Sequence, residues 1–246
     1  MRIQVVLLVA LAAVASADEE GGILDSIRNG FNRAGAAFSS LYATYETAPY
    51  TVERTVKTDD GESIIYEERN YPGQKWVCTT EIDDEEEEQS KDAFMRLFGY
   101  ITGDNEGGIT IPMTTPVSMV REPLTAEELA NQESQSDEDT QEQESEEVHS
   151  KYTMCFYINQ ANQENAPPPT NPEVYIENRP TMTVIASQTG GYMDDEDWVA
   201  MADKLKQDAT AQGETGVDYS SFYRAGYDSP MKFWNRRNEI WYVKQA

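Results

Sequence analysis

The chain has 246 residues and a formal net charge of −26, because 45 Asp and Glu stand against 19 Lys and Arg. So acidic a protein repels phosphate backbones, which argues against a nucleic-acid partner. The length allows one sizeable core in one or two domains.

Residues 1–17 have the features of a secretory signal peptide. Arg2 supplies the positive start, residues 5–14 are apolar, and Ala15-Ser16-Ala17 fits a small-residue cleavage site. The apolar run is shorter than the about 20 residues that a transmembrane helix needs. We therefore expect a soluble, secreted, extracellular protein without a transmembrane segment.

Residues 18–47 are predicted to form an N-terminal helix or arm, since apolar residues recur at three- and four-residue steps over 22–45. One interpretation is a helix that seeks a membrane or a partner. The other is a helix packed on the domain, or a frayed arm. The second is preferred, because the polar face lacks the Lys and Arg density of interfacial helices.

The next elements alternate between strands and a helix. Residues 50–56 and 63–68 are predicted strands, and 76–82 forms a third after a break at Tyr71-Pro72-Gly73. The acidic run 83–88 is interpreted as a solvated loop before a helix, with a calcium site as a weaker alternative. That helix covers 90–101 and stops at Gly103. Its apolar stripe consists of Ala93, Phe94, Leu97, Phe98 and Ile101. A strand is expected over 109–113.

Residues 122–150 differ in composition from the rest. They contain eleven acidic residues, no Lys or Arg and no aromatic residue. Such a segment cannot bury a core, so it is predicted to be a disordered acidic insertion in a single domain spanning 48–246.

The second half repeats the pattern of the first. A strand over 151–158 leads through the proline-rich stretch 166–172 to strand-like residues 173–187, a helix over 194–211, and closing strands at 222–226 and 239–243. The motif YEERNYP at 66–72 returns as YIENRP at 175–180. This duplication predicts one pseudo-symmetric domain of two βαβ-type halves, with the binding cleft at their seam.

Cys78 and Cys155 are the two cysteines, and both lie in strand-like runs. In a secreted protein an even count favours a disulfide, which staples the core if the two strands are neighbours. The alternative is a pair of buried free thiols.

Most catalytic chemistries lack their residues here. The one histidine, His149, lies at the end of the acidic insertion, which argues against a Ser-His-Asp or Cys-His set. One histidine and two cysteines are too few for a zinc site built from four such ligands, and no glycine-rich nucleotide motif occurs. Paired carboxylates are too abundant to be informative. We therefore expect a protein that is not an enzyme.

Several segments resemble the SOUL family of heme-binding proteins over residues 48–243. They are YEER at 66–69 with KWV at 75–77, FMRLFGYI at 94–101, MTTPV at 113–117, FYI at 156–158 before PPP at 167–169, AGYDSP at 225–230 and NRRNEIW at 235–241. The resemblance implies an α+β fold, in which two repeated halves form a twisted, barrel-like antiparallel sheet flanked by two helices.

The resemblance also implies a function, the non-catalytic binding of heme or a related tetrapyrrole as a carrier or buffer. Asn70 stands where one subfamily has its proposed iron-ligating histidine, so heme is expected to bind without that ligand. The positions that match the apolar groove and the cations near the propionates are Lys91, Phe94, Leu97 and Lys232.

Three alternatives stay open. The cations between Arg224 and Lys244 form a locally basic segment but can equally balance neighbouring carboxylates, and Phe94 and Leu97 can be ordinary core residues. The protein can also be a secreted, non-heme interaction module of the same fold, which binds a protein through its acidic loop or another apolar ligand in its groove. A monomer is expected in either case.

Overall fold

The computed structural model describes residues 45–82, 86–126, 128, 150–228 and 235–245. The predicted signal peptide, nearly all of the N-terminal helix or arm, most of the acidic insertion and Lys232 lie outside the described residues. The described part of the chain contains no helix with the length and apolar composition needed to cross a bilayer.

The main element is a nine-stranded antiparallel sheet in the order β2-β3-β9-β11-β10-β6-β7-β4-β8. Its strands are β2 (Thr51–Lys57), β3 (Ile64–Tyr71), β4 (Gln74–Ile82), β6 (Val117–Pro123), β7 (Ser150–Tyr157), β8 (Val174–Arg179), β9 (Met182–Thr189), β10 (Tyr223–Gly226) and β11 (Asn238–Lys244). A separate parallel pair joins β1 (Glu46–Thr47) to β5 (Thr114–Thr115), and a short 3-10 helix, η1, covers Gln160–Asn162.

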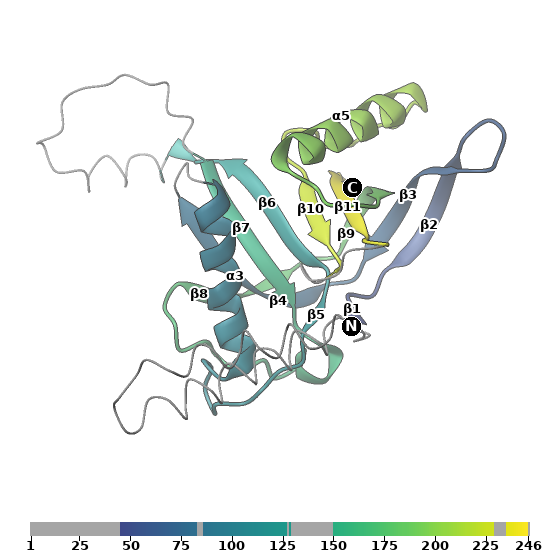
Figure 1. Ribbon diagram of the computed structural model, residues 1–246. Helices are drawn as coiled ribbons and strands as arrows, with labels where there is room; N and C mark the ends of the chain where they lie inside the picture. Colours follow the sequence, from purple (N-terminus) through teal and green to yellow (C-terminus); the bar gives the residue numbers. More distant parts are fainter. Residues whose placement is uncertain (1–44, 83–85, 127, 129–149, 229–234, 246) are drawn as a thin grey trace, which may run out of the picture. The chain divides into compact units, whose positions relative to one another are not determined.

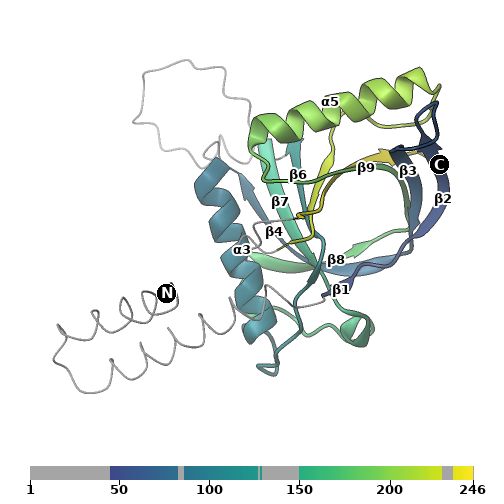
Figure 2. The same ribbon diagram turned by 45° about the vertical axis from the view of Figure 1, so that its right-hand side comes forward.

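The two copies of the duplicated motif pair with each other. β3 and β4 are one long strand interrupted at Pro72, and β8 and β9 are a second one interrupted at Pro180. The register is unchanged across the interruptions, because Tyr71 lies opposite Met182 and Gln74 lies opposite Arg179. One part of these two long strands, the pair β3-β9, lies near one end of the strand order, and the other part, β4-β8, lies at the opposite end. The sheet therefore curls into a half-barrel (Figure 2).

The predicted pseudo-symmetry is confirmed. Each half, however, has more strands than the predicted βαβ unit. Each half runs strand, strand, helix, strand, strand: β3-β4-α3-β6-β7, then β8-β9-α5-β10-β11. The halves also meet at the antiparallel pair of β6 and β10. The predicted α+β fold with a barrel-like sheet and two helices is therefore correct.

The two helices, α3 (Glu86–Thr102) and α5 (Asp195–Ala211), cover separate parts of the sheet (Figure 1). α3 packs on β4 and β7, and α5 packs on β11 and β3. α5 begins with a capping box, in which Asp194 accepts from the Asp197 backbone amide and Asp197 accepts from that of Asp194. Ala93, Leu97 and Ile101 of the predicted apolar stripe are buried in α3, and so is Tyr100, which the stripe did not include.

The strand predicted over residues 109–113 is wrong. This segment is irregular, although Ile109, Ile111 and Met113 alternate as in a strand. The side chain of Asn105 replaces a strand partner, because its amide donates to the carbonyl of Ile109 at 2.8 Å and its oxygen accepts from the Ile109 amide at 3.0 Å. Asn105 thus satisfies both backbone groups of Ile109, and Gly107 and Gly108, both at positive φ, lie in the turn before it.

The predicted disulfide is present. Cys78 on β4 lies directly opposite Cys155 on β7, and the two sulfur atoms are bonded. Both cysteines are completely buried. The alternative of two free thiols is excluded for this structure.

Candidate functional site

The outward side of α3 carries the first predicted site residues. Phe94 is half-buried, and its ring lies 5.3 Å from that of Phe156 on β7 and 6.1 Å from that of Phe98 one turn along the helix. Leu97 is completely buried in the core beneath the helix. Leu97 therefore holds α3 on the sheet, whereas Phe94 reaches from the core to the surface.

Three neighbours of Phe94 are exposed. Lys91 is exposed, and so are 49% of Met95 and 37% of Phe98. Residues three and four apart are neighbours on a helix surface, so Lys91, Phe94, Met95 and Phe98 form one continuous patch, here called the α3 face. A surface helix normally turns polar residues outward, so the exposed apolar side chains make the α3 face a candidate binding surface.

Part of this patch was not predicted from the sequence. Phe98 was placed in the apolar stripe, and Met95 was given no role. The spacing of Met95 and Phe98 from Lys91 was the available signal, since four and seven residues bring them to the same side of the helix.

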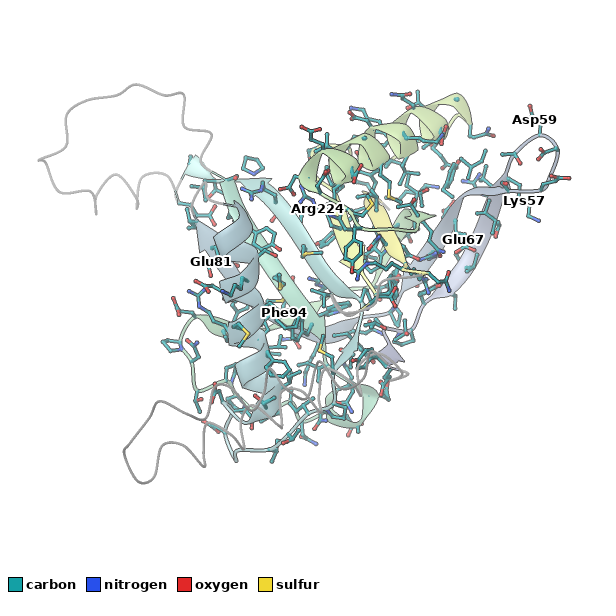
Figure 3. The ribbon with its side chains drawn as sticks, viewed as in Figure 1. Lys57, Asp59, Glu67, Glu81, Phe94 and Arg224 are labelled. Carbon is teal, nitrogen blue, oxygen red and sulfur yellow. A yellow bond between two sulfur atoms is a disulfide. The ribbon has the colours of Figure 1, made fainter. Side chains whose placement is uncertain are left out.

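The opposite flank of α3 is fixed by charge. Arg96 pairs with Glu81 on β4, and its Nε lies 3.1 Å from a carboxylate oxygen of Glu173. Figure 3 shows Glu81 and Phe94 on different sides of the helix. Arg96 therefore anchors the helix, and the α3 face stays directed away from the anchoring side.

The basic segment between Arg224 and Lys244 is largely neutralised by carboxylates. Arg224 pairs with Asp195 at the start of α5, and Nζ of Lys244 lies 3.0 Å from Glu68 and 3.2 Å from Glu214. The interpretation as charge balance is therefore correct for these two cations. Lys232, the fourth predicted site residue, lies outside the described residues, so its place in the site stays a prediction.

Asn70, the position of the subfamily's histidine, lies on β3. It is half-buried, and its side-chain amide donates to Oγ1 of Thr183 on β9 at 3.3 Å. The strands that contact α3 most are β4, β7 and β8, and no histidine occurs among the described residues. Within that part of the chain no imidazole accompanies the α3 face.

The concave interior of the sheet holds two matching Glu-x-Arg units. In both, Nε of the arginine lies 2.8 Å from the carboxylate two residues earlier: Arg69 on Glu67, and Arg179 on Glu177. Each guanidinium also stacks on an aromatic ring, Arg69 at 4.4 Å over Tyr50 and Arg179 at 4.3 Å over Trp76. The duplicated motif therefore encodes a duplicated cation–aromatic contact.

The first unit is joined to a buried carboxylate, Glu239 on β11. Nη1 of Arg69 lies 2.8 Å from Glu239 and Nη2 of Arg237 lies 2.6 Å from it, while Tyr227 and Trp241 donate at 2.9 and 2.8 Å. Burial alone raises the pKa of Glu239, but the two arginines outweigh it and lower the pKa overall. Glu239 is a charged, fully hydrogen-bonded structural group.

The interior tyrosines stay protonated at neutral pH. Burial, and then the negative charge of Glu239, raise the pKa values of Tyr71 and Tyr227. Neutral phenols donate hydrogen bonds but do not act as bases or nucleophiles. Tyr227 uses its hydroxyl in this way, because it donates to the Glu239 carboxylate.

The half-barrel of two repeated halves, flanked by two helices, defines a protein of the α+β class. The chain belongs to the SOUL heme-binding protein family, whose model matches residues 45–243, the extent of the fold from β1 to β11. The membership that the sequence segments predicted is confirmed.

Named relatives match over most of their length. Heme-binding protein 1 of Mus musculus is 33% identical over 215 residues, which cover 85% of this chain and 98% of that protein. Heme-binding protein 2 of Homo sapiens is 28% identical over 215 residues, which cover 86% of this chain and 92% of that protein. The protein in a cryo-EM structure of an EcmrR–DNA complex reaches only a TM-score of 0.48 at 10% identity, over 97% of this chain and 77% of that one, and adds nothing to the assignment.

Proposed function

We propose that this chain binds heme or a related tetrapyrrole reversibly and without catalysis, over the α3 face. The observation that carries the proposal is a contiguous patch in a member of a heme-binding family, in which Lys91, Met95 and Phe98 are exposed around the half-buried Phe94. A tetrapyrrole offers two flat apolar faces and two carboxylates, and such a ligand needs apolar contacts with a cation at the edge.

The residues of the α3 face divide these tasks. Phe98 and Met95 offer apolar area to the macrocycle, and Phe94 connects that area to the core through Phe156. Lys91 is exposed, and its ammonium group is assigned to a propionate. Lys232 is proposed as the second cation.

Iron ligation by histidine forms no part of this proposal. Asn70 replaces the subfamily's histidine and is engaged with Thr183, and the chain's one histidine is His149. Binding then depends on the macrocycle and its propionates. Hemin and the iron-free porphyrin are therefore expected to bind with similar affinity.

The test is a hemin titration read by the Soret band and by tryptophan fluorescence, repeated with iron-free protoporphyrin. We expect saturation at micromolar or tighter affinity for both. Lys91→Ala should weaken binding by about two- to fivefold, the worth of an exposed ion pair. Lys57→Ala is the matched control, since Lys57 lies on the β2–β3 hairpin away from α3 (Figure 3). Absence of saturation, or equal effects of the two substitutions, would contradict the proposal.

We also propose that the protein acts outside the cell as a tetrapyrrole carrier or buffer. The signal-like residues 1–17 and the Cys78–Cys155 disulfide support this, because disulfides persist in oxidising compartments. N-terminal sequencing of chain recovered from culture medium should begin at Asp18. Recovery only from the cell interior, with residues 1–17 retained, would contradict it.

A further inference from the structure

We propose that reduction of the Cys78–Cys155 disulfide opens a binding site for a thiophilic divalent cation such as Zn²⁺, with Glu177 as the third protein ligand. The three residues come from the adjacent strands β7, β4 and β8, with Cys78 on the central one. Counting only histidines and cysteines excluded a zinc site in the sequence. The carboxylate that completes this one is contributed by the second copy of the duplicated motif.

The carboxylate oxygen lies near ligand spacing from both sulfurs, whereas the sulfurs, bonded in the disulfide, would separate to about 3.8 Å on a tetrahedral zinc once reduced. Oε2 of Glu177 lies 3.2 Å from Sγ of Cys78 and 3.7 Å from Sγ of Cys155. All three donor atoms lie within 4.8 Å of one another. On a tetrahedral zinc with Zn–S of about 2.3 Å and Zn–O of about 2.1 Å, a sulfur and an oxygen are about 3.6 Å apart.

In the disulfide form, no hydrogen bond connects the two sulfurs to the Glu177 carboxylate. Neither sulfur of a disulfide carries a proton, so neither donates to the carboxylate that lies against both. A dithiol reductant changes this: it supplies two electrons and two protons, the S–S bond breaks, each sulfur becomes a thiol, and the reductant becomes a cyclic disulfide. Binding of the cation then releases the two thiol protons to solvent.

Charge balance favours a divalent cation at this place. Two thiolates and one carboxylate carry three negative charges, and the cation together with the Arg179 guanidinium carries three positive ones. Nε of Arg179 lies 2.8 Å from Oε2 of Glu177, and Arg179 is only 6% exposed. Arg179 therefore orients the carboxylate as outer-shell partners of metal ligands do.

The site also has a connection to solvent. Both cysteines are fully buried, but the side chain of Glu177 is 39% exposed. The carboxylate thus bridges the buried sulfurs and the surface, and water would supply the fourth ligand of a tetrahedral ion. The disulfide closes the site and its reduction opens it.

The experiment uses the full chain, reduced with dithiothreitol and freed of reductant by anaerobic gel filtration. Co²⁺ is titrated as the probe, because its thiolate complexes give charge-transfer bands, and Zn²⁺ is then added to displace it. The variants are Glu177→Gln, the double variant Cys78→Ser/Cys155→Ser, and Glu106→Gln, which removes an exposed carboxylate from a distant loop as the matched control.

We expect one Co²⁺ per reduced chain and none per oxidised chain. Glu177→Gln should weaken binding at least about tenfold, the loss that even outer-shell changes cause at metal sites, while Glu106→Gln has no effect. Binding that persists in the double variant, equal affinity in the two glutamine variants, or no thiolate bands would overturn the proposal. Far-UV circular dichroism checks each fold, and if the double variant is unfolded, the comparison of Glu177→Gln with Glu106→Gln decides.

Discussion

The buried carboxylate of Glu239 depends on several hydrogen-bond donors to stay charged. We expect its replacement to destabilise the fold strongly. It accepts hydrogen bonds from Arg69, Arg237, Tyr227 and Trp241 and is itself fully buried. Glu239→Gln keeps the shape but removes the charge and points an amide donor at a cluster of donors. Arg69 then remains 3% exposed with a single carboxylate partner, Glu67.

Removing one partner of a buried ion pair costs about 3–5 kcal/mol, since the other charge stays desolvated. We expect Glu239→Gln to lower the free energy of unfolding by that amount. The measurement is urea unfolding of the oxidised chain, followed by tryptophan fluorescence at constant m-value. Glu53→Gln, on the exposed strand β2, is the matched control and should change stability by less than about 0.5 kcal/mol. A loss below about 1 kcal/mol for Glu239→Gln would refute the reasoning.

The same group gives a pH dependence with a defined sign. The pKa of Glu239 is lowered in the folded state, because the two arginines outweigh the opposing effect of burial. Its contribution is therefore complete above the unfolded pKa of about 4.3 and is lost as the pH falls through the lower folded pKa. The stability difference between the wild type and Glu239→Gln should be constant near neutral pH and shrink in acid. A difference that stays constant into strong acid would contradict the assignment.

Two further predictions concern the cross-link and the acidic insertion. Reduction of the Cys78–Cys155 disulfide, which closes a loop with a sequence separation of 77, should lower the free energy of unfolding by up to about 4–5 kcal/mol. The measurement is urea unfolding with a chelator present, and equal midpoints of the two forms would contradict this. Deletion of residues 129–149 should leave the hemin affinity unchanged, because Pro123 and Ser150 are already paired across β6 and β7. A weaker affinity in the titration would show that the insertion belongs to the site.

Regular elements with a clear period were predictable from the sequence. The helix stripe through Ala93, Leu97 and Ile101 and the strand around Cys78 follow spacing rules that local sequence obeys. The residues 109–113 fit the same alternation rule but form no strand, since the side chain of Asn105 takes the backbone bonds that a neighbouring strand would provide.

The candidate site was only partly predictable. The sequence indicated that α3 bears the site, but it did not reveal that Leu97 turns inward while Met95 and Phe98 stay exposed, because both orientations fit an apolar stripe. The burial and the partners of Glu239 could not be predicted either, since its main partner, Arg69, lies 170 residues away in the sequence. Long-range register, which the strand pairing fixes, decides such contacts.

A hemin titration of Phe98→Ser against Val199→Ser tests the central claim most directly. Both substitutions remove an exposed apolar side chain from a helix, but only Phe98 belongs to the α3 face, whereas Val199 is on α5 and 47% exposed. The exposed 37% of the Phe98 side chain is worth about 1.5–2 kcal/mol when a macrocycle covers it, which is roughly tenfold to thirtyfold in affinity. We predict that loss for Phe98→Ser and no change for Val199→Ser. Equal affinities of the two variants would show that the tetrapyrrole does not bind to the α3 face.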